Sequence, residues 1–273
     1  MTRFLGIVLI ATLLALVVAA CDDDDTGGPA ANATPGGTSV DGRGPTVDCA
    51  QHDAPDEIDD AKLLIEFNST DNDTGVHGLF DSGGFAELCV YAPDGSLILA
   101  VKPQGPLQDL GMGGIFFESR EPAEDEVAQA ATLDTFPEGP YTVRATTFDG
   151  NGLVGIATFT HDIPMPPVIT FPEEGAVVDT DALVVTWEPV TQTLSGDPAA
   201  ITSYEVIVTD DSDDAADPNG FARPVLSVHV PPSVSSLTIP SEFLQPGVEY
   251  ELELIALEES GNQTITVLFF ETA

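Results

Sequence analysis

The sequence predicts an all-β protein with two antiparallel β-sandwiches in tandem, the first of them carrying one short helix. Three observations predict it. Short segments that alternate apolar and polar residues recur from residue 61 to residue 273, and clusters of Gly, Pro, Asn and Asp separate them. Only residues 122–135 have the composition of a helix. The length of 273 residues fits two domains of about 100 residues each after an N-terminal extension.

Residues 1–20 are expected to be a signal peptide. Arg3 is the only charged residue, and the apolar run from Phe4 to Val18 is shorter than the roughly 20 residues of a membrane-spanning helix. The segment ends in Val18-Ala19-Ala20-Cys21, which resembles the lipobox of bacterial lipoproteins. The resemblance implies lipidation of Cys21 and an exported protein, anchored to a bacterial membrane and facing the periplasm or the cell surface. An ordinary cleavable signal followed by an unrelated cysteine is the alternative.

Residues 21–60 are expected to be a flexible acidic linker, disordered after the lipidated cysteine. Asp, Gly, Pro, Ala, Thr and Asn dominate this stretch, which holds too few large apolar side chains to offset its ordering entropy. The ~27 residues between Cys21 and Cys49 would span roughly 30 Å as a flexible chain. Asp22–Asp25 are typical of inner-membrane retention in enterobacterial lipoproteins, but they would also repel any anionic surface, so the choice of membrane stays open.

The remaining cysteines, Cys49 and Cys89, form an even pair in an exported chain. We expect one disulfide between them, which would be worth roughly 4 kcal/mol in the chain-entropy model. The alternative is a metal site made by Cys49, His52 and Cys89, but a single C-x-x-H pair without a second one indicates a metal only weakly.

Residues 61–165 are expected to form the first sandwich. Pro93-Asp94-Gly95 and Asp149-Gly150-Asn151-Gly152 predict tight turns. Pro122 and the acidic residues at 124–126 suit the first turn of the predicted helix. The expected strands are residues 61–67, 85–91, 96–101, 115–118, 141–147 and 153–161.

Residues 166–273 carry two marks of one family. Trp187 is the only tryptophan and lies in an apolar segment, and Leu244-Gln245-Pro246-Gly247-Val248-Glu249-Tyr250 precedes an alternating segment. This half resembles a fibronectin type III domain. The resemblance implies that Trp187 packs in the core and that Tyr250 forms a tyrosine corner by hydrogen-bonding to its upstream chain. The acidic stretch at residues 210–220 departs from the family pattern as an insertion between strands.

The first half echoes the second. Phe136-Pro137-Glu138-Gly139-Pro140-Tyr141 precedes an alternating segment and a Gly-Asn turn, as the segment ending at Tyr250 does. We therefore expect Tyr141 to occupy the same structural place, and the two halves to be distantly related immunoglobulin-like sandwiches. The first half has no tryptophan and carries the helix.

The charge of the chain argues against two kinds of binding. With 46 Asp and Glu against 7 Lys and Arg, the formal net charge is −39. Nucleic-acid binding requires basic side chains on phosphates, and docking on anionic lipid requires a basic patch. Neither is expected here. The acidity is typical of proteins that meet high salt, with cation binding as the functional alternative.

One acidic segment is a candidate calcium site. Asp71 and Asp73, with Asn68 and Asp81, could supply the oxygen ligands that Ca²⁺ prefers. The segment is not an EF-hand, because the glycine comes one place early and Ser82 stands where the bidentate glutamate should be. An Asx-rich turn is the alternative. A weaker candidate is the acidic loop that holds Asp210, Asp211, Asp213, Asp214 and Asp217.

The sequence predicts no catalytic residues and no enzyme. It contains no G-x-S-x-G, H-E-x-x-H or G-x-x-x-x-G-K-[ST] motif. We expect the dispersed histidines His52, His77, His161 and His229 to lie at the surface or at strand edges. The expected function is that of a lipid-anchored, non-enzymatic cell-envelope interaction or spacer module that contacts an envelope protein or a glycan. The alternative is a calcium-dependent adhesion or envelope-binding protein that uses its acidic loops.

Overall fold

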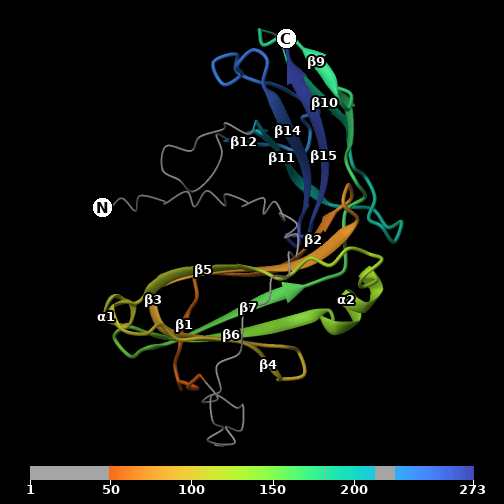
Figure 1. The fold of residues 1–273 in the computed structure, drawn as a ribbon. Coiled ribbons are helices and arrows are strands. Elements are labelled where there is room, and N and C mark those ends of the chain that lie inside the picture. Colours follow the sequence, from red (N-terminus) through yellow and green to blue (C-terminus); the bar gives the residue numbers. More distant parts are fainter. Residues whose placement is uncertain (1–48, 182, 213–224) are drawn as a thin grey trace, which may run out of the picture. The chain divides into compact units, whose positions relative to one another are not determined.

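The computed structural model describes residues 49–181, 183–212 and 225–273. The predicted signal peptide, Cys21 and most of the linker lie outside the described residues, as do Asp213, Asp214 and Asp217. The described residues are mostly β-strand, so the all-β prediction is confirmed (Figure 1). Neither of the two helices in this part of the chain has the length and apolar composition needed to span a membrane.

The first half folds around one long strand. Its elements are β1 (Asp56–Glu57), β2 (Asp60–Asn68), β3 (Asp73–Tyr91), β4 (Leu97–Val101), α1 (Pro106–Leu110), β5 (Met112–Glu118), α2 (Gln129–Thr135), β6 (Gly139–Thr147) and β7 (Gly152–Phe159). The first part of β3 pairs with β2 and β5, and its last part pairs with β4 and β6. The register shifts between Asp81 and Phe85, where Gly84 has φ of 125°, so a single strand contributes to both layers.

A hydrophobic core lies between these two layers. Ile65 and Phe80 come from the layer of β2, β3 and β5, and Val143 and Phe159 come from the layer of β6 and β7. All four are 0–1% exposed. Figure 1 shows the two layers facing each other. Alternation along each strand sends every second side chain into this core.

The second half has two sheets around a separate core. Its strands are β8 (Val168–Phe171), β9 (Ala176–Val178), β10 (Val184–Glu188), β11 (Ile201–Asp210), β12 (Val225–Val230), β13 (Ser236–Thr238), β14 (Glu249–Glu258) and β15 (Gln263–Thr272). One sheet has the order β13-β10-β8, and β15, β14, β11 and β12 belong to the other. Trp187 on β10 packs against Tyr204 on β11, with ring centroids 5.6 Å apart.

One sheet runs through both halves. β15 pairs with β2 in parallel, with Gln263 opposite Glu66 and Ile265 opposite Asn68. As a result, 12 strands form one sheet, and the described residues belong to one compact unit. This junction was not expected from the sequence, and the division into domains at residues 165 and 166 stays a prediction.

Two local expectations are corrected. Of the predicted helix at residues 122–135, only Gln129–Thr135 is helical, because the preceding segment is tied to the start of β3: the Glu124 amide donates to the Asn72 carbonyl, and Ala123 bridges to Asp73. No strand was predicted at residues 75–84, which hold four glycines, and glycine weakens strand propensity. This segment is paired on both sides and forms the first part of β3.

Candidate functional site

The β2–β3 layer carries ionisable side chains on the face that points away from the core. Ile65 and Val76 pack in the core, so their chain neighbours Glu66 and His77 point to the opposite face. Asp73 lies on that face as well, four residues before His77 on the same strand. Glu118 on β5 is opposite His77 in the strand register. The sheet therefore places Glu66 and Glu118 beside the His77 imidazole, with Asp73 further along the same face.

His77 lies between two glutamates. Its Nε2 is 2.9 Å from Glu121 Oε1, within hydrogen-bond distance, and its Nδ1 is 3.7 Å from Glu66 Oε2. The side chains of His77 and Glu66 are only 2% and 4% exposed, and that of Glu121 is 20% exposed. The prediction that His77 lies at the surface or at a strand edge is therefore wrong. One potential ligand atom from each of these three residues lies within 4.8 Å of the others.

Gly75 makes room for Glu121. Gly75 is opposite Glu66 in the register of β2 and β3. A Cβ atom at position 75 would collide with the Glu121 carboxylate. The missing side chain therefore creates the space over the sheet in which Glu121 approaches His77.

Burial and crowding of like charges shift the protonation of this cluster. Burial raises the pKa of the Glu66 carboxyl from 4.5 to about 7, against the attraction of His77. Burial, followed by repulsion from Glu121, raises the pKa of Asp73 from 3.8 to about 6 and also raises the pKa of Glu118. Burial alone would lower the pKa of His77, but the hydrogen bond to Glu121 and the charge of Glu66 outweigh it and raise this pKa above 6.5.

One oxygen of the cluster has no partner. Asp73 Oδ1 is buried and makes no hydrogen bond within the described residues. Buried polar atoms are nearly always paired, so an exception of this kind calls for an explanation. Among the described residues, no lysine or arginine forms an ion pair with the carboxylates of Asp73, Glu66, Glu118 or Glu121. The arrangement can hold a proton or a metal ion between His77 and the carboxylates.

The cluster lies beside the junction of the two halves. Gln263 on β15 donates a hydrogen bond to Glu66 Oε2. The adjacent Asn262 accepts from the Ile65 amide at 2.8 Å and donates to the Thr160 carbonyl at 3.1 Å. Asn262 is 1% exposed. Side chains of the second half therefore satisfy polar groups of the first.

The predicted calcium residues are not brought together as a set of four. Asn68 Oδ1 accepts from the Thr70 amide at 3.0 Å, and Asn68 Nδ2 donates to Asp71 at 2.9 Å, so Asn68–Asp71 is an Asx turn. Asp73 begins β3, and Asp81 lies eight residues further along that strand, which places it about 26 Å away at the usual rise per residue. Asp81 therefore cannot bind the same ion as Asp71 and Asp73. In the second candidate loop, Asp210 accepts hydrogen bonds from Ser212.

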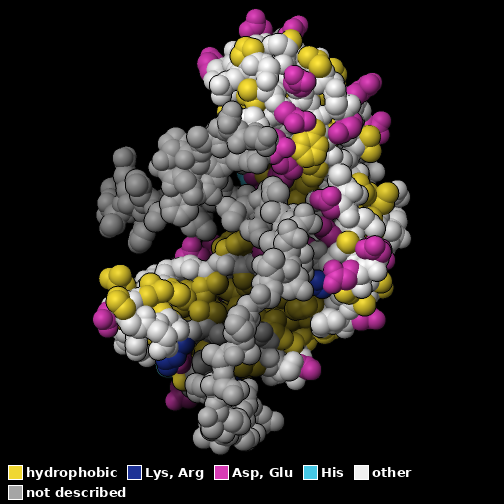
Figure 2. Space-filling model, viewed as in Figure 1, with side chains coloured by type: hydrophobic (Ala, Val, Ile, Leu, Met, Phe, Trp, Pro, Cys, Tyr) yellow, Lys and Arg dark blue, Asp and Glu magenta, His cyan; other side chains and the backbone are white. Residues whose placement is uncertain are grey.

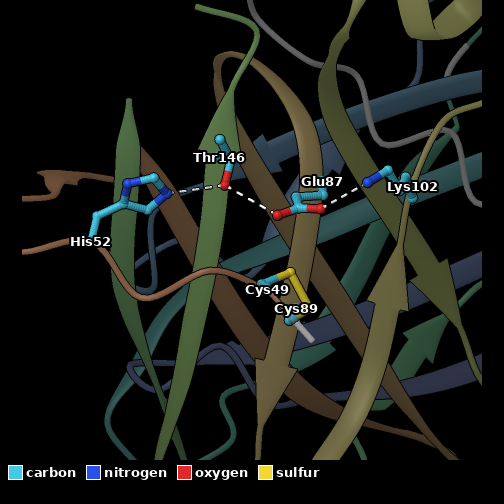
Figure 3. The surroundings of a disulfide bond; sticks show 6 residues. All are labelled: Cys49, His52, Glu87, Cys89, Lys102 and Thr146. Atoms are coloured by element: carbon cyan, nitrogen blue, oxygen red, sulfur yellow. Dashed lines mark hydrogen bonds and ion pairs between the residues drawn. A yellow bond between two sulfur atoms is a disulfide. The ribbon is translucent and has the colours of Figure 1, made fainter. Parts of the chain in front are cut away.

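A disulfide fixes the start of the described chain. Cys49 and Cys89 are bonded, with Cα atoms 5.8 Å apart. Figure 3 shows a polar chain nearby, in which Lys102 donates to Glu87 at 3.1 Å and Thr146 lies between Glu87 and His52. His52 lies over Gly152, where a side chain would collide with it. His52 thus contacts a threonine and a glycine instead of joining the two cysteines at a metal.

Both predicted tyrosine positions are buried and bonded to upstream chain. The Tyr250 hydroxyl accepts from the Gln245 amide at 2.9 Å and donates to the Phe243 carbonyl at 3.4 Å. The Tyr141 hydroxyl donates to the Pro137 carbonyl at 3.0 Å. Trp187 is 3% exposed. These residues are structural.

Sequence reasoning missed Glu66, His77 and Glu121. Glu66 offered a signal, because it is a charged residue inside the apolar run Leu63-Leu64-Ile65-Glu66-Phe67. A charge at such a position is costly unless it is paired. Nothing in the sequence indicated that Glu121, 44 residues beyond His77, would fold back over Gly75.

Acidic side chains are spread over the visible face rather than gathered in one patch (Figure 2).

No protein-family model matches the sequence, and no curated protein matches it. Among solved structures, the chain is similar to the crystal structure of the chicken CNTN1 FN1–FN3 domains, at 12% identity and a TM-score of 0.33, over 80% of this chain and 68% of that one. It is also similar to a tetra-tandem repeat from the extending region of a large adhesion protein, at 11% identity and a TM-score of 0.26, over 77% of this chain and 48% of that one.

Proposed function

We propose that this chain is an exported, lipid-anchored cell-envelope protein that acts as a non-enzymatic interaction or spacer module. The observation that carries the proposal is the continuous sheet: the β2–β15 ladder joins the two halves through main-chain pairing. Two β-sandwiches joined in this way resist bending more than two domains on a loose linker would. A stiff body suits a module that holds a contact surface away from a membrane.

The attachment to the membrane is supported by the sequence Val18-Ala19-Ala20-Cys21 and by the disulfide. The Cys49–Cys89 bond closes the chain onto the folded part 28 residues after Cys21. A force on the lipid anchor would therefore be transmitted through the disulfide to Cys89 on β3. An envelope protein or a glycan is the proposed partner, met through loops and exposed side chains such as Phe116 and Phe148.

The anchor is tested by metabolic labelling with a clickable fatty acid, followed by membrane fractionation. The wild-type chain should carry the label and sediment with the membrane, and Cys21→Ser should lose the label. Gln104→Ala, on an exposed loop of the first half, is the control and should keep the label. An unlabelled wild-type chain in the soluble fraction would contradict the anchor.

The stiffness is tested by measuring the distance between spin labels at Ser96 and Ser233, one in each half. A single narrow distance distribution is expected in the wild type. The junction variant Asn262→Ala should broaden it, while Gln104→Ala, on an exposed loop of the first half, should not. A broad distribution in the wild type would contradict the rigid module without bearing on the lipid anchor.

A further inference from the structure

We propose that Glu66, His77 and Glu121 bind one divalent transition-metal ion beside the junction of the two halves. This site is independent of the proposed envelope role, since an anchored module can exist with or without it. The proposal is argued from ligand chemistry, geometry, burial and charge.

The ligand atoms have the spacing that one ion requires. Zn²⁺ binds nitrogen and carboxylate oxygen at about 2.0–2.2 Å, so two ligands of one tetrahedral ion lie about 3.4 Å apart. His77 Nδ1 and Glu66 Oε2 are separated by 3.7 Å, and all three ligand atoms fit within 4.8 Å. Since only one imidazole nitrogen can bind the ion, a glutamate side chain would shift by up to about 1.4 Å to bring the three ligand atoms to this spacing, and a water would take the fourth position.

The surroundings hold the ligands in place. Gln263 donates to Glu66, and the ring of Phe116 packs edge-on against His77 with centroids 5.7 Å apart. Gly75 leaves the space that Glu121 fills. Groups of this kind around a metal site orient the ligands and tune their affinity.

The charge of the pocket favours a dication over an internal ion pair. Glu66, Glu121 and Glu118 act on one imidazole, which neutralises at most one of three negative charges. No lysine or arginine of the described residues forms an ion pair with these carboxylates.

The histidine distinguishes this site from a calcium site. Ca²⁺ takes six to eight oxygen ligands, whereas imidazole nitrogen suits Zn²⁺ and the other transition metals. The only nitrogen among the three ligands is also the most buried one. Selection of a transition metal should therefore depend on His77.

The test is a Zn²⁺ titration of the full-length protein, stripped of metal beforehand and followed by calorimetry. We expect one Zn²⁺ per chain. His77→Asn, Glu66→Gln and Glu121→Gln should each weaken binding about tenfold or more. His229→Gln is the matched control, because His229 also faces a glutamate, Glu205, at 3.3 Å but is 57% exposed.

A second readout needs no variant and so does not depend on variants that fold. In wild-type protein with ¹⁵N-labelled histidine, Zn²⁺ should shift the imidazole signals of one histidine of four. The proposal is overturned if Zn²⁺ does not saturate at one per chain, if no single histidine responds, or if His77→Asn binds as the wild type does. It is also overturned if Ca²⁺ displaces Zn²⁺ at equal concentration.

Discussion

In the second half, Tyr250 closes the upstream chain over a core that holds Trp187 and Tyr204, and in the first half Tyr141 makes a similar bond to Pro137. Each half also buries a carboxyl whose pKa is raised by burial to about 7, Glu66 in the first and Glu253 in the second. Of these two carboxyls, Glu66 is the one that lies against a buried histidine, His77. The tyrosine hydrogen bond is common to both halves and is part of the fold. The buried Glu66 and His77 are not needed for folding, so we look for function there.

The largest expected effect comes from removing the Cys49–Cys89 disulfide, which lies in the first half. The variant Cys49→Ala/Cys89→Ala should lose about 4 kcal/mol of unfolding free energy, because the 40-residue separation of the two cysteines restricts the unfolded chain. Urea unfolding measures the loss. A reducing agent should destabilise the wild type by a similar amount and leave the double variant unchanged. Equal stability of both proteins would contradict this assignment.

The next effect concerns the buried charge of the first half. A carboxyl whose pKa is raised by folding stabilises the folded state below its unfolded value and loses that contribution as the pH rises through the folded value. For Glu66, the pKa rises from 4.5 to about 7, so metal-free protein should lose up to about 3 kcal/mol between pH 4.5 and pH 8. The pKa values of Asp73 and His77 are also raised by folding, so both residues lower the stability further as the pH rises.

Urea unfolding in the presence of a chelator at pH 5 and pH 8 measures this slope. Glu66→Gln should reduce it, because the amide does not titrate, while Asp73, His77 and Glu253 maintain the remainder. Asp94→Asn, at an exposed turn in the same half, should leave it unchanged. A wild-type protein that is more stable at pH 8 than at pH 5 would contradict the burial of an uncompensated Glu66 carboxylate.

A smaller effect is expected at the junction. Asn262→Ala leaves the Ile65 amide without its acceptor, and a buried donor without a partner costs about 1–3 kcal/mol. Thermal unfolding should show the loss. Gln192→Ala, which removes an exposed side chain bonded only to the Gly196 carbonyl, is the control and should change the midpoint little.

The smallest effect compares the two corners directly. Tyr250→Phe removes an acceptor for the Gln245 amide and a donor to Phe243, whereas Tyr141→Phe removes one donor to Pro137. Each should cost about 1 kcal/mol, with the larger loss at Tyr250. Urea midpoints of the two variants decide the order. A larger loss at Tyr141 would mean that the first half depends more on its corner than the second.

The sequence predicted the strand-rich fold, because alternation and turn residues are local signals. Tyr250 could be assigned to a tyrosine corner because its motif spans seven consecutive residues. Trp187 could be placed in a core because it lies in an apolar segment. The β2–β15 pairing could not be predicted, because it joins residues about 200 positions apart and depends on main-chain groups that carry no sequence signal. The cluster around His77 was missed for a similar reason: Glu66, His77 and Glu121 come from three separate segments, and only Glu66 looked out of place locally.

One sheet joins the two halves and holds the cluster of Glu66, His77 and Glu121 at its junction. Amide hydrogen exchange tests it most directly at the β2–β15 ladder, where the Ser69 amide donates to the Ile265 carbonyl at 2.9 Å. The amides of Ile65 and Ser69 should exchange as slowly as those of neighbouring core strands such as β14. Exchange of these two amides at the rate of an exposed loop, with β14 still protected, would contradict this junction.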